Sequence, residues 1–244
     1  MTNSVFTILE NQSIARNIYK MVLRGDTSAI TAPGQFVNLR LDGKFLRRPI
    51  SVCDLEEDVL TLIYKPQGEG TKAMTFYKPG KDLDLLVGLG NGYDTALSGQ
   101  RPLLVGGGVG VPPLYLLCRR LTAQGRAPHV ILGFNTQDEV FYEKEFRSLG
   151  ATVDCRTLDG SYGQKGLVTD GIQAAGEYTY LYTCGPEPML KAVWALCDTS
   201  GQFSFEERMG CGFGACMGCS CKTKYGNKRI CKDGPVLVKE EILW

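Results

Sequence analysis

Five of the ten cysteines in this 244-residue chain lie between residues 211 and 231. Four of them, Cys211, Cys216, Cys219 and Cys231, follow the spacing C-x4-C-x2-C-x11-C. The first three match the spacing of plant-type ferredoxins, in which a fourth cysteine further along the chain completes the ligands of a [2Fe–2S] cluster. The spacing therefore predicts that these four thiolates bind a [2Fe–2S] cluster.

The residues around these cysteines are small, which lets backbone N–H groups approach the sulfur atoms and influence the reduction potential. They are Gly210, Gly212, Gly214, Ala215 and Gly218. A structural zinc site is the alternative, but such sites usually combine two C-x2-C ligand pairs, and this segment supplies one that fits. Cys221 follows Cys219 by only two residues, and we expect it to be a buried or spare thiol.

A glycine-rich stretch, VGGGVGVPP at residues 105–113, lies between a predicted strand and a predicted helix. Glycines at such a junction let a pyrophosphate reach backbone N–H groups at the helix N-terminus. The full dinucleotide fingerprint is not met, because Val111 stands where Gly or Ala is required and no acidic residue ends the next strand. This stretch alone is also compatible with an ordinary turn. TCGPEPML (183–190) and the polar loop LDGSYGQKGLVTD (158–170) favour a nucleotide site.

The first hundred residues contain two further candidate phosphate-binding features. RRPISV at 47–52 contains Arg48 and Ser51, and GEGT at 68–71 precedes a predicted helix. An arginine and a helix N-terminus can together hold a pyrophosphate, and a serine hydroxyl can hydrogen-bond a flavin ring nitrogen. Each feature alone is common in surface ion pairs or turns, so the prediction of a flavin site depends on their joint arrangement.

Three stretches of different pattern must position these residues. Residues 1–97 contain short strands rich in β-branched and aromatic residues, which predicts a small antiparallel β-barrel domain with one helix at 71–80. Residues 98–200 alternate strands and helices, which predicts an α/β domain with a parallel sheet and helices on both faces. Residues 201–244 are rich in Gly and Cys with little periodicity, and we expect a small [2Fe–2S] domain that a bound group orders.

The expected elements are short and separated by turn residues. The barrel strands are expected at 5–11, 17–25, 34–41, 49–54 and 59–65. In the second domain, strands are expected at 101–108, 129–135, 151–159 and 178–186, and helices at 111–125, 139–150 and 187–197.

The composition excludes several classes of function. A net charge of +1 with no basic run argues against nucleic acid or an anionic membrane surface as the main partner. The N-terminal residues lack a secretory signal pattern, and the apolar runs are too short for a membrane span. We therefore expect a cytoplasmic protein with reduced thiols, which weakens a disulfide explanation for the cysteines at 211–231.

The order of the motifs resembles that of a known family. A barrel with R-x-x-S and G-x-G-T, followed by an α/β domain with GGGVGVPPL and TCGPEPM, is similar to the ferredoxin–NADP reductase superfamily. RMGCGFGACMGC followed by CKDGPV narrows this to a resemblance to the electron-transfer subunits of NAD-dependent, B-type dihydroorotate dehydrogenases. The resemblance covers essentially all of the chain.

The resemblance implies that the barrel domain (1–97) binds FAD and that the α/β domain (98–200) binds NAD, each through a set of residues. FAD would be bound by Arg48, Pro49, Ile50, Ser51, Ile63, Tyr64, Lys65, Gly70 and Thr71. The NAD site would be formed by Gly107, Gly108, Gly110, Cys184, Gly185 and Pro186, and the metal ligands would be the four cysteines named above. The absence of Arg or Lys near Asn135 to Glu139 favours NAD over NADP, because no partner for a 2′-phosphate is evident.

These cofactors imply an oxidoreductase subunit that transfers electrons. A nicotinamide exchanges two electrons as a hydride, an iron–sulfur cluster carries one, and a flavin does both, so we expect FAD between the other two. The family implies that dihydroorotate is oxidised at an FMN of a separate catalytic subunit, in pyrimidine biosynthesis, within a heterotetramer of two plus two subunits. The single histidine, His129, is expected to be structural, and we assign no catalytic acid or base.

Two alternatives stay open from the sequence. The first is an NAD(P)H reductase subunit that serves ferredoxin or another flavoenzyme. The second belongs to another class, a zinc-stabilised interaction module without a redox role. Flavin and iron–sulfur absorption bands would separate the redox functions from the zinc module.

Overall fold

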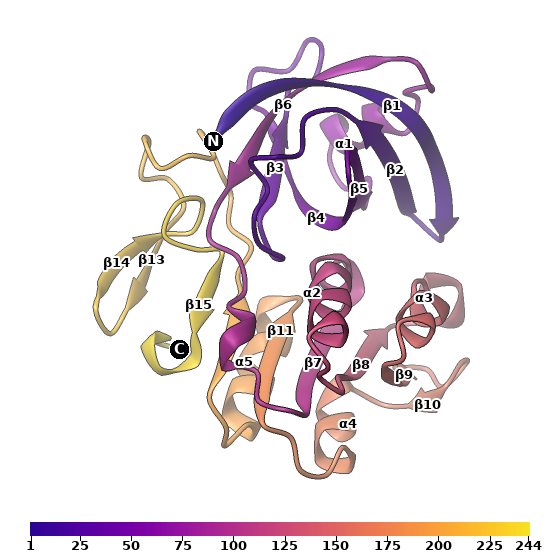
Figure 1. Cartoon of the computed structure of the whole chain (residues 1–244), viewed down its shortest axis with the longest axis vertical. Helices are drawn as coiled ribbons and strands as arrows, with labels where there is room; N and C mark the ends of the chain where they lie inside the picture. Colours follow the sequence, from indigo (N-terminus) through magenta and orange to yellow (C-terminus); the bar gives the residue numbers. More distant parts are fainter.

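The first part of the chain is a closed antiparallel barrel (Figure 1), in a computed structural model that describes all residues from 1 to 244. Its strands are β1 (Thr2–Ala15), β2 (Ile18–Arg24), β3 (Phe36–Leu39), β4 (Arg48–Glu56), β5 (Val59–Tyr64) and β6 (Asp82–Leu89), joined in the order β1-β2-β5-β4-β3-β6. The predicted barrel is confirmed. The strand β6 is absent from the prediction, although Leu83, Leu85 and Val87 alternate into the barrel core with the period of a strand.

The helix predicted at 71–80 is shorter in the structure and begins earlier, as α1 (Glu69–Met74). The side-chain amide of Asn11, on β1, donates to the carbonyls of Met74 at 2.8 Å and Tyr77 at 3.0 Å. Carbonyls at the end of a helix need such partners. The helix therefore ends where the barrel strand binds it, before Pro79-Gly80.

The second part is built on a seven-stranded sheet with the order β10-β9-β8-β7-β11-β12-β15. Its strands are β7 (Pro102–Gly107), β8 (His129–Phe134), β9 (Thr152–Thr157), β10 (Gln164–Lys165), β11 (Tyr180–Cys184), β12 (Gly201–Ser204) and β15 (Val236–Val238). Neighbouring strands are parallel except for β12 and β15, which pair antiparallel. The predicted parallel sheet is confirmed and extends beyond the predicted strands.

Helices cover both faces of this sheet, as predicted. They are α2 (Pro112–Ala123), α3 (Glu143–Ser148), α4 (Val168–Ala174) and α5 (Glu187–Leu196). Leu104 and Val130 pack with α2 and α3, whereas Leu103 and Ile131 pack with α4 and α5. Because successive residues of a strand point to opposite faces, these apolar strands need a helix layer on each side.

The helix predicted over 139–150 is limited to α3, because Tyr142 before it adopts a left-handed φ of 65°. Four short 3-10 helices complete the chain, at Thr95–Leu97, Gly108–Gly110, Gln137–Glu139 and Lys239–Glu241. No helix of the structure has both the length and the apolar character that crossing a membrane requires.

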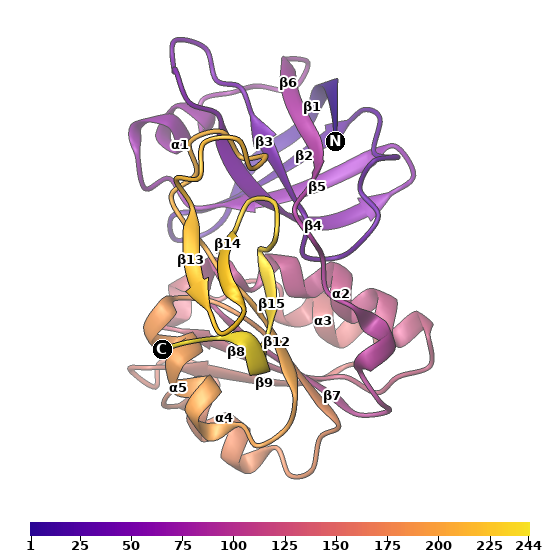
Figure 2. The ribbon, with the colours of Figure 1, turned by 90° about the vertical axis from the view of Figure 1, so that its left-hand side faces the viewer.

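The last part of the chain is ordered by two kinds of pairing. β13 (Ser220–Thr223) and β14 (Gly226–Arg229) form a separate hairpin, whereas β12 and β15 join the large sheet. We call residues 205–235, between β12 and β15, the cluster lobe. It lies beside both the barrel and the sheet (Figure 2). The division drawn at residue 200 therefore assigns two strands of the sheet to the third part.

The barrel and the sheet are joined through α2. Arg119 of α2 forms an ion pair with Asp54 of β4 at 3.0 Å and donates to the carbonyl of Leu55. Leu116, on the same helix, packs into the barrel core. The helix that begins at the glycine-rich stretch therefore holds β4, the strand of RRPISV, against the second domain.

Candidate functional site

The RRPISV and GEGT stretches meet at one edge of the barrel. Arg48 begins β4, Gly70 lies in α1, and a methyl group added at Gly70 would overlap the Nε atom of Arg48. The half-buried Arg48 guanidinium donates to the carbonyls of Leu46 and Arg47. A cation bonded to neutral carbonyls is suited to bind a phosphate. The structure thus brings together two residues that the sequence predicts for FAD.

Other predicted FAD residues surround this contact. Pro49 and Ser51 share one face of β4, and Ile50 points to the other face and packs against the barrel core. The hydroxyl of Thr71 accepts a hydrogen bond from the backbone N–H of Gly68 at 3.2 Å. Thr71 therefore holds the turn that begins α1, and Pro49 and Ser51 lie on the face of β4 opposite Ile50.

Ile63 and Tyr64 are buried in hydrophobic cores at the end of β5. The Tyr64 hydroxyl donates to Oδ1 of Asn11 at 3.0 Å, and burial raises the pKa of Tyr64. Lys65, the next residue, is half-buried. With the Ile63 and Tyr64 side chains occupied in the cores, a contribution of these two residues to a flavin site would come from their backbone groups.

The glycine-rich loop after β7 and the TCGP turn after β11 lie against each other. The two strands are parallel neighbours, with Gly106 opposite Cys184. A methyl group added at Gly110 would overlap the Cys184 carbonyl, and one at Gly107 would lie 2.5 Å from Sδ of Met189. Adjacent parallel strands end at the same edge of the sheet, where dinucleotides bind in such folds. The structure therefore gathers the predicted NAD residues at one edge.

This edge presents open backbone. Gly108 has a φ of 52°, and an added methyl group there would meet no atom within 4 Å. Pro186 is the N-cap of α5, directly after Gly185, so the N-terminus of that helix faces the same edge. Burial raises the pKa of Cys184 to about 12, so this side chain is a neutral thiol at neutral pH. The arrangement suits a pyrophosphate bound by backbone N–H groups.

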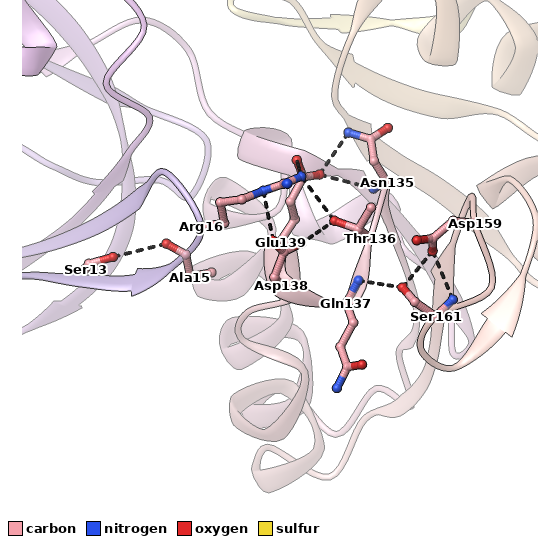
Figure 3. Close-up of polar contacts among 10 residues, drawn as sticks. All are labelled: Ser13, Ala15, Arg16, Asn135, Thr136, Gln137, Asp138, Glu139, Asp159 and Ser161. Atoms are coloured by element: carbon pink, nitrogen blue, oxygen red, sulfur yellow. Dashed lines mark hydrogen bonds and ion pairs between the residues drawn. The ribbon is translucent and has the colours of Figure 1, made fainter.

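A pocket at the ends of β8 and β9 continues this edge. It is lined by Thr136, Gln137, Asp138, Asp159 and Ser161 (Figure 3). β8 pairs with β7, so the pocket follows the glycine-rich loop along the sheet. An extended dinucleotide that starts at the glycines would place its far end here.

The fold brings Arg16, from the turn between β1 and β2, to the segment in which the sequence has no Arg or Lys (Figure 3). The Nε of Arg16 lies 3.0 Å from Oδ2 of Asp138, and its Nη2 lies 2.9 Å from Oε1 of Glu139. Sequence reasoning missed this cation, because more than a hundred residues separate it from the segment and no motif marks it.

The four predicted cluster cysteines form two pairs in the cluster lobe. The thiols of Cys211 and Cys216 lie close enough to shift the pKa of Cys211, and the thiol of Cys219 likewise affects the pKa of Cys231. The backbone N–H of Cys231 also donates to Sγ of Cys219 at 3.4 Å. A two-iron cluster with four thiolate ligands needs two thiolates for each iron, so paired thiols fit this cofactor. No group of three or more His, Cys, Asp or Glu side chains is arranged to hold a single metal ion.

Backbone N–H groups point at the sulfur of Cys211. The N–H of Ala215 donates to this Sγ at 3.3 Å. Partial burial raises the pKa of Cys211, but hydrogen bonds from the backbone of Phe213, Cys216 and Ala215 outweigh it and lower the pKa to about 6. The thiolate is the form that binds a metal, so the loop favours the required state.

The two pairs differ in exposure. Cys216 is exposed, whereas Cys219 and Cys231 are 2% and 1% exposed. Burial raises the pKa of Cys231 to about 12 and also raises that of Cys221, which lies on β13 opposite Lys228. The exclusion of Cys221 from the ligand set stays a prediction.

The cluster lobe is attached to the barrel beside the strand of RRPISV. Asn38 of β3 donates through Nδ2 to the carbonyl of Cys211 at 3.3 Å, and a methyl group added at Gly212 would overlap that Nδ2. Asn38 lies directly opposite Pro49 of β4. A single strand therefore separates the cysteine loop from the predicted flavin residues. No motif marks Asn38, which lies in an ordinary strand.

Two family models match the chain. The model of the iron-sulfur cluster binding domain of dihydroorotate dehydrogenase B matches residues 206–243. The model of the oxidoreductase NAD-binding domain matches residues 104–194. These ranges contain the four paired cysteines and the glycine-rich edge of the sheet, respectively.

Relatives match over the whole chain. The electron transfer subunit of dihydroorotate dehydrogenase B (NAD(+)) from Geobacillus sp. (strain WCH70) is 43% identical, over 100% of this chain and 99% of its own length. The subunit of the same description from Fusobacterium nucleatum is 45% identical, over 97% of this chain and 96% of its own length.

Solved structures share the fold. A structure of an NADH-dependent reduced ferredoxin-NADP oxidoreductase, studied for flavin-based electron bifurcation, has a TM-score of 0.89 and 28% identity, over 98% of this chain and 90% of its own. A ferredoxin NADP+ reductase from Neisseria gonorrhoeae with bound FAD and NADP has a TM-score of 0.70 and 16% identity, over 80% of this chain and 90% of its own. The second likeness concerns the fold alone.

Proposed function

The chain belongs to the family of electron-transfer subunits of dihydroorotate dehydrogenase B, and from this premise we propose the route that electrons take through it. They pass from the FMN of a dihydroorotate-oxidising partner through the [2Fe–2S] cluster and FAD to NAD+, in pyrimidine biosynthesis. The chain is an oxidoreductase subunit with FAD, [2Fe–2S] and NAD as its cofactors.

The observation that carries the route is the position of β4 between the other two sites. On one side, β3 separates it from the loop of Cys211 through the Asn38 contact. On the other side, Arg119 of α2 binds it to the domain with the glycine-rich edge. A flavin held at β4 is therefore next to both the cluster site and the nicotinamide site. This position matches its capacity to exchange one electron with a cluster and two with a nicotinamide.

In this proposal, residues of the chain bind and orient the FAD, the nicotinamide dinucleotide and the cluster. Arg48 holds a phosphate of FAD, and Gly70 leaves the space that its guanidinium occupies. Gly110 allows the two loops of the nicotinamide site to touch, so that backbone N–H groups of the glycine-rich loop before α2 face a pyrophosphate. The hydrogen bond to the sulfur of Cys211 stabilises the thiolate form.

The partner is a catalytic subunit, and we propose that two copies of each subunit form a heterotetramer. The exposed side of the cluster lobe supports contact with a partner there, because Cys216 is exposed and Phe213 and Met217 nearby are 42% and 55% exposed. Exposed apolar side chains beside a redox group are typical of protein contact sites. The cytoplasm is the proposed compartment, supported by ten free cysteines.

The test is to purify the complex and assay it with dihydroorotate and NAD+. We expect flavin and iron–sulfur absorption in this chain, a co-purifying flavoprotein, and NAD+ reduction that requires both chains. Reduction of NAD+ by dihydroorotate with this chain alone would contradict the division of labour. Ferredoxin as the sole effective partner would favour a reductase that serves ferredoxin, and a colourless protein with stoichiometric zinc would refute a redox role.

A further inference from the structure

Arg16 reaches the nucleotide edge from the other domain of the chain. It lies in the tight turn between β1 and β2, beside Asn17, which has a φ of 57°. The backbone N–H of Arg16 donates to the carbonyl of Asp138 at 2.8 Å. This bond attaches the turn to the pocket segment independently of the arginine side chain, so the guanidinium stays nearby when its own bonds are removed.

The guanidinium of Arg16 forms ion pairs with both Asp138 and Glu139 of the pocket segment. Nε lies 3.0 Å from Asp138 and Nη2 lies 2.9 Å from Glu139, while Nη2 also donates to the hydroxyl of Thr136 at 3.2 Å. The second oxygen of Glu139 accepts from the side chain of Asn135 at 2.8 Å. One positive charge thus faces two negative charges beside a hydroxyl that lines the pocket.

The rest of the pocket adds negative charge. Asp159 accepts hydrogen bonds from the N–H and hydroxyl of Ser161, whose Oγ accepts the N–H of Gln137 at 2.8 Å. A further cation, Lys165, packs its side chain against Gly160 beside Asp159. Carboxylates at this position accept hydrogen bonds from the hydroxyls of a ribose and repel a 2′-phosphate.

We propose that Arg16 is a specificity-determining residue, which Asp138 and Glu139 hold so that the site selects NAD(H) and not NADP(H). The inference deepens the proposed function, because it assumes that the pocket receives the adenosine end of NAD. A guanidinium is well suited to bind a 2′-phosphate. This chain already carries a guanidinium within hydrogen-bond distance of the pocket. To bind the 2′-phosphate of NADP(H), this guanidinium would only have to be released from the two carboxylates.

The test uses the full chain with Asp138→Asn and Glu139→Gln combined, because amides keep the shape and remove the charges. The probes are AMP and adenosine 2′,5′-bisphosphate, which differ in the 2′-phosphate, with dissociation constants measured by titration calorimetry. We expect the bisphosphate to bind the double variant about tenfold more tightly than it binds the wild type, because the released guanidinium forms charge-assisted hydrogen bonds with the 2′-phosphate. The dissociation constant of AMP should change by less than about twofold, because AMP has no 2′-phosphate for the released guanidinium to bind.

The matched control adds Arg16→Ala to the double variant. We expect the gain for the bisphosphate to disappear, whereas Arg16→Ala alone should change its affinity by less than about threefold, because the guanidinium is already occupied. A gain that persists without Arg16 would assign it to Lys165 or to the loss of negative charge, and would overturn the proposal. No gain in the double variant would overturn it as well.

Two measurements keep the result interpretable. Glu139→Gln alone, which can still accept the Asn135 amide, should give a smaller gain of the same sign if the double variant does not fold. Wild-type chain that binds neither AMP nor NADH would refute the proposed function together with this inference. Intact AMP and NADH binding without the expected gain would refute the role of Arg16 alone.

Discussion

The glycine-rich edge of the sheet and the cluster lobe use opposite means to build a site. At the edge, Gly110 and Cys184 come together because β7 and β11 are parallel neighbours and because no side chain stands between the loops. In the lobe, short pieces of irregular chain carry the cysteine thiols in two pairs. The first site is made by backbone and by the absence of side chains, and the second by side-chain chemistry.

This difference predicts which substitutions matter in each region. Removing one sulfur should remove the cofactor from the lobe and leave the sheet intact. Adding one methyl group should damage the edge without touching any reactive group.

Cys216→Ser should abolish the [2Fe–2S] cluster, because a hydroxyl replaces one of the four thiolate ligands. FAD should stay bound, since no predicted flavin residue lies in the lobe. The measurement is the iron content and the visible spectrum of the purified chain. Cys221→Ser is the matched control and should retain the cluster; its loss there would show that the ligand set is chosen wrongly.

Gly110→Ala should raise the KM for NADH about tenfold or more, because the new methyl group overlaps the Cys184 carbonyl and backbone cannot move aside as a flexible side chain does. The assay is NADH oxidation with an artificial electron acceptor. Val109→Ala, which shortens a side chain in the same loop, should change KM by less than about threefold. Equal effects of the two variants would refute the importance of the close backbone approach.

Gly70→Ala should weaken FAD binding several-fold, because the methyl group displaces the Arg48 guanidinium from its place beside α1. The effect should be smaller than at Gly110, because a long side chain can shift. Gly68→Ala is an apt control, since its φ is −108° and no atom lies within 4 Å of an added methyl group. FAD dissociation constants from fluorescence titration compare them, and an equal loss at Gly68 would count against a role of Arg48.

Asn38→Leu should change the free energy of unfolding by no more than about 1 kcal/mol, although Asn38 lies between the two cofactor regions. The substitution leaves the Cys211 carbonyl without its donor, but it also removes the buried Oδ1 of Asn38, which has no partner. These effects oppose each other in the free energy of unfolding. The electron paramagnetic resonance spectrum of the reduced cluster should change, because Cys211 is a predicted ligand; an unchanged spectrum would separate Asn38 from the cluster.

Much of the fold follows from local pattern. The alternation and turn residues before residue 98 predict a barrel, and the alternating strands and helices after it predict a parallel sheet, because side-chain period and burial are coupled in both cases. Apart from β6, whose alternation was overlooked, two predictions failed where distant contacts overrode or supplied the local pattern. Asn11 ends α1 early, and the short strand β15 is specified by its pairing with β12 more than by its own three residues.

The candidate site divides along the same line. The spacing of Cys211, Cys216, Cys219 and Cys231 determined the predicted cofactor by itself, because metal ligation depends on residue type and local separation. Only the tertiary structure placed Arg48 against Gly70, Asn38 against Cys211 and Arg16 beside the nucleotide pocket. These contacts join residues far apart in the chain, and strand order and domain packing bring them together, which no local spacing encodes.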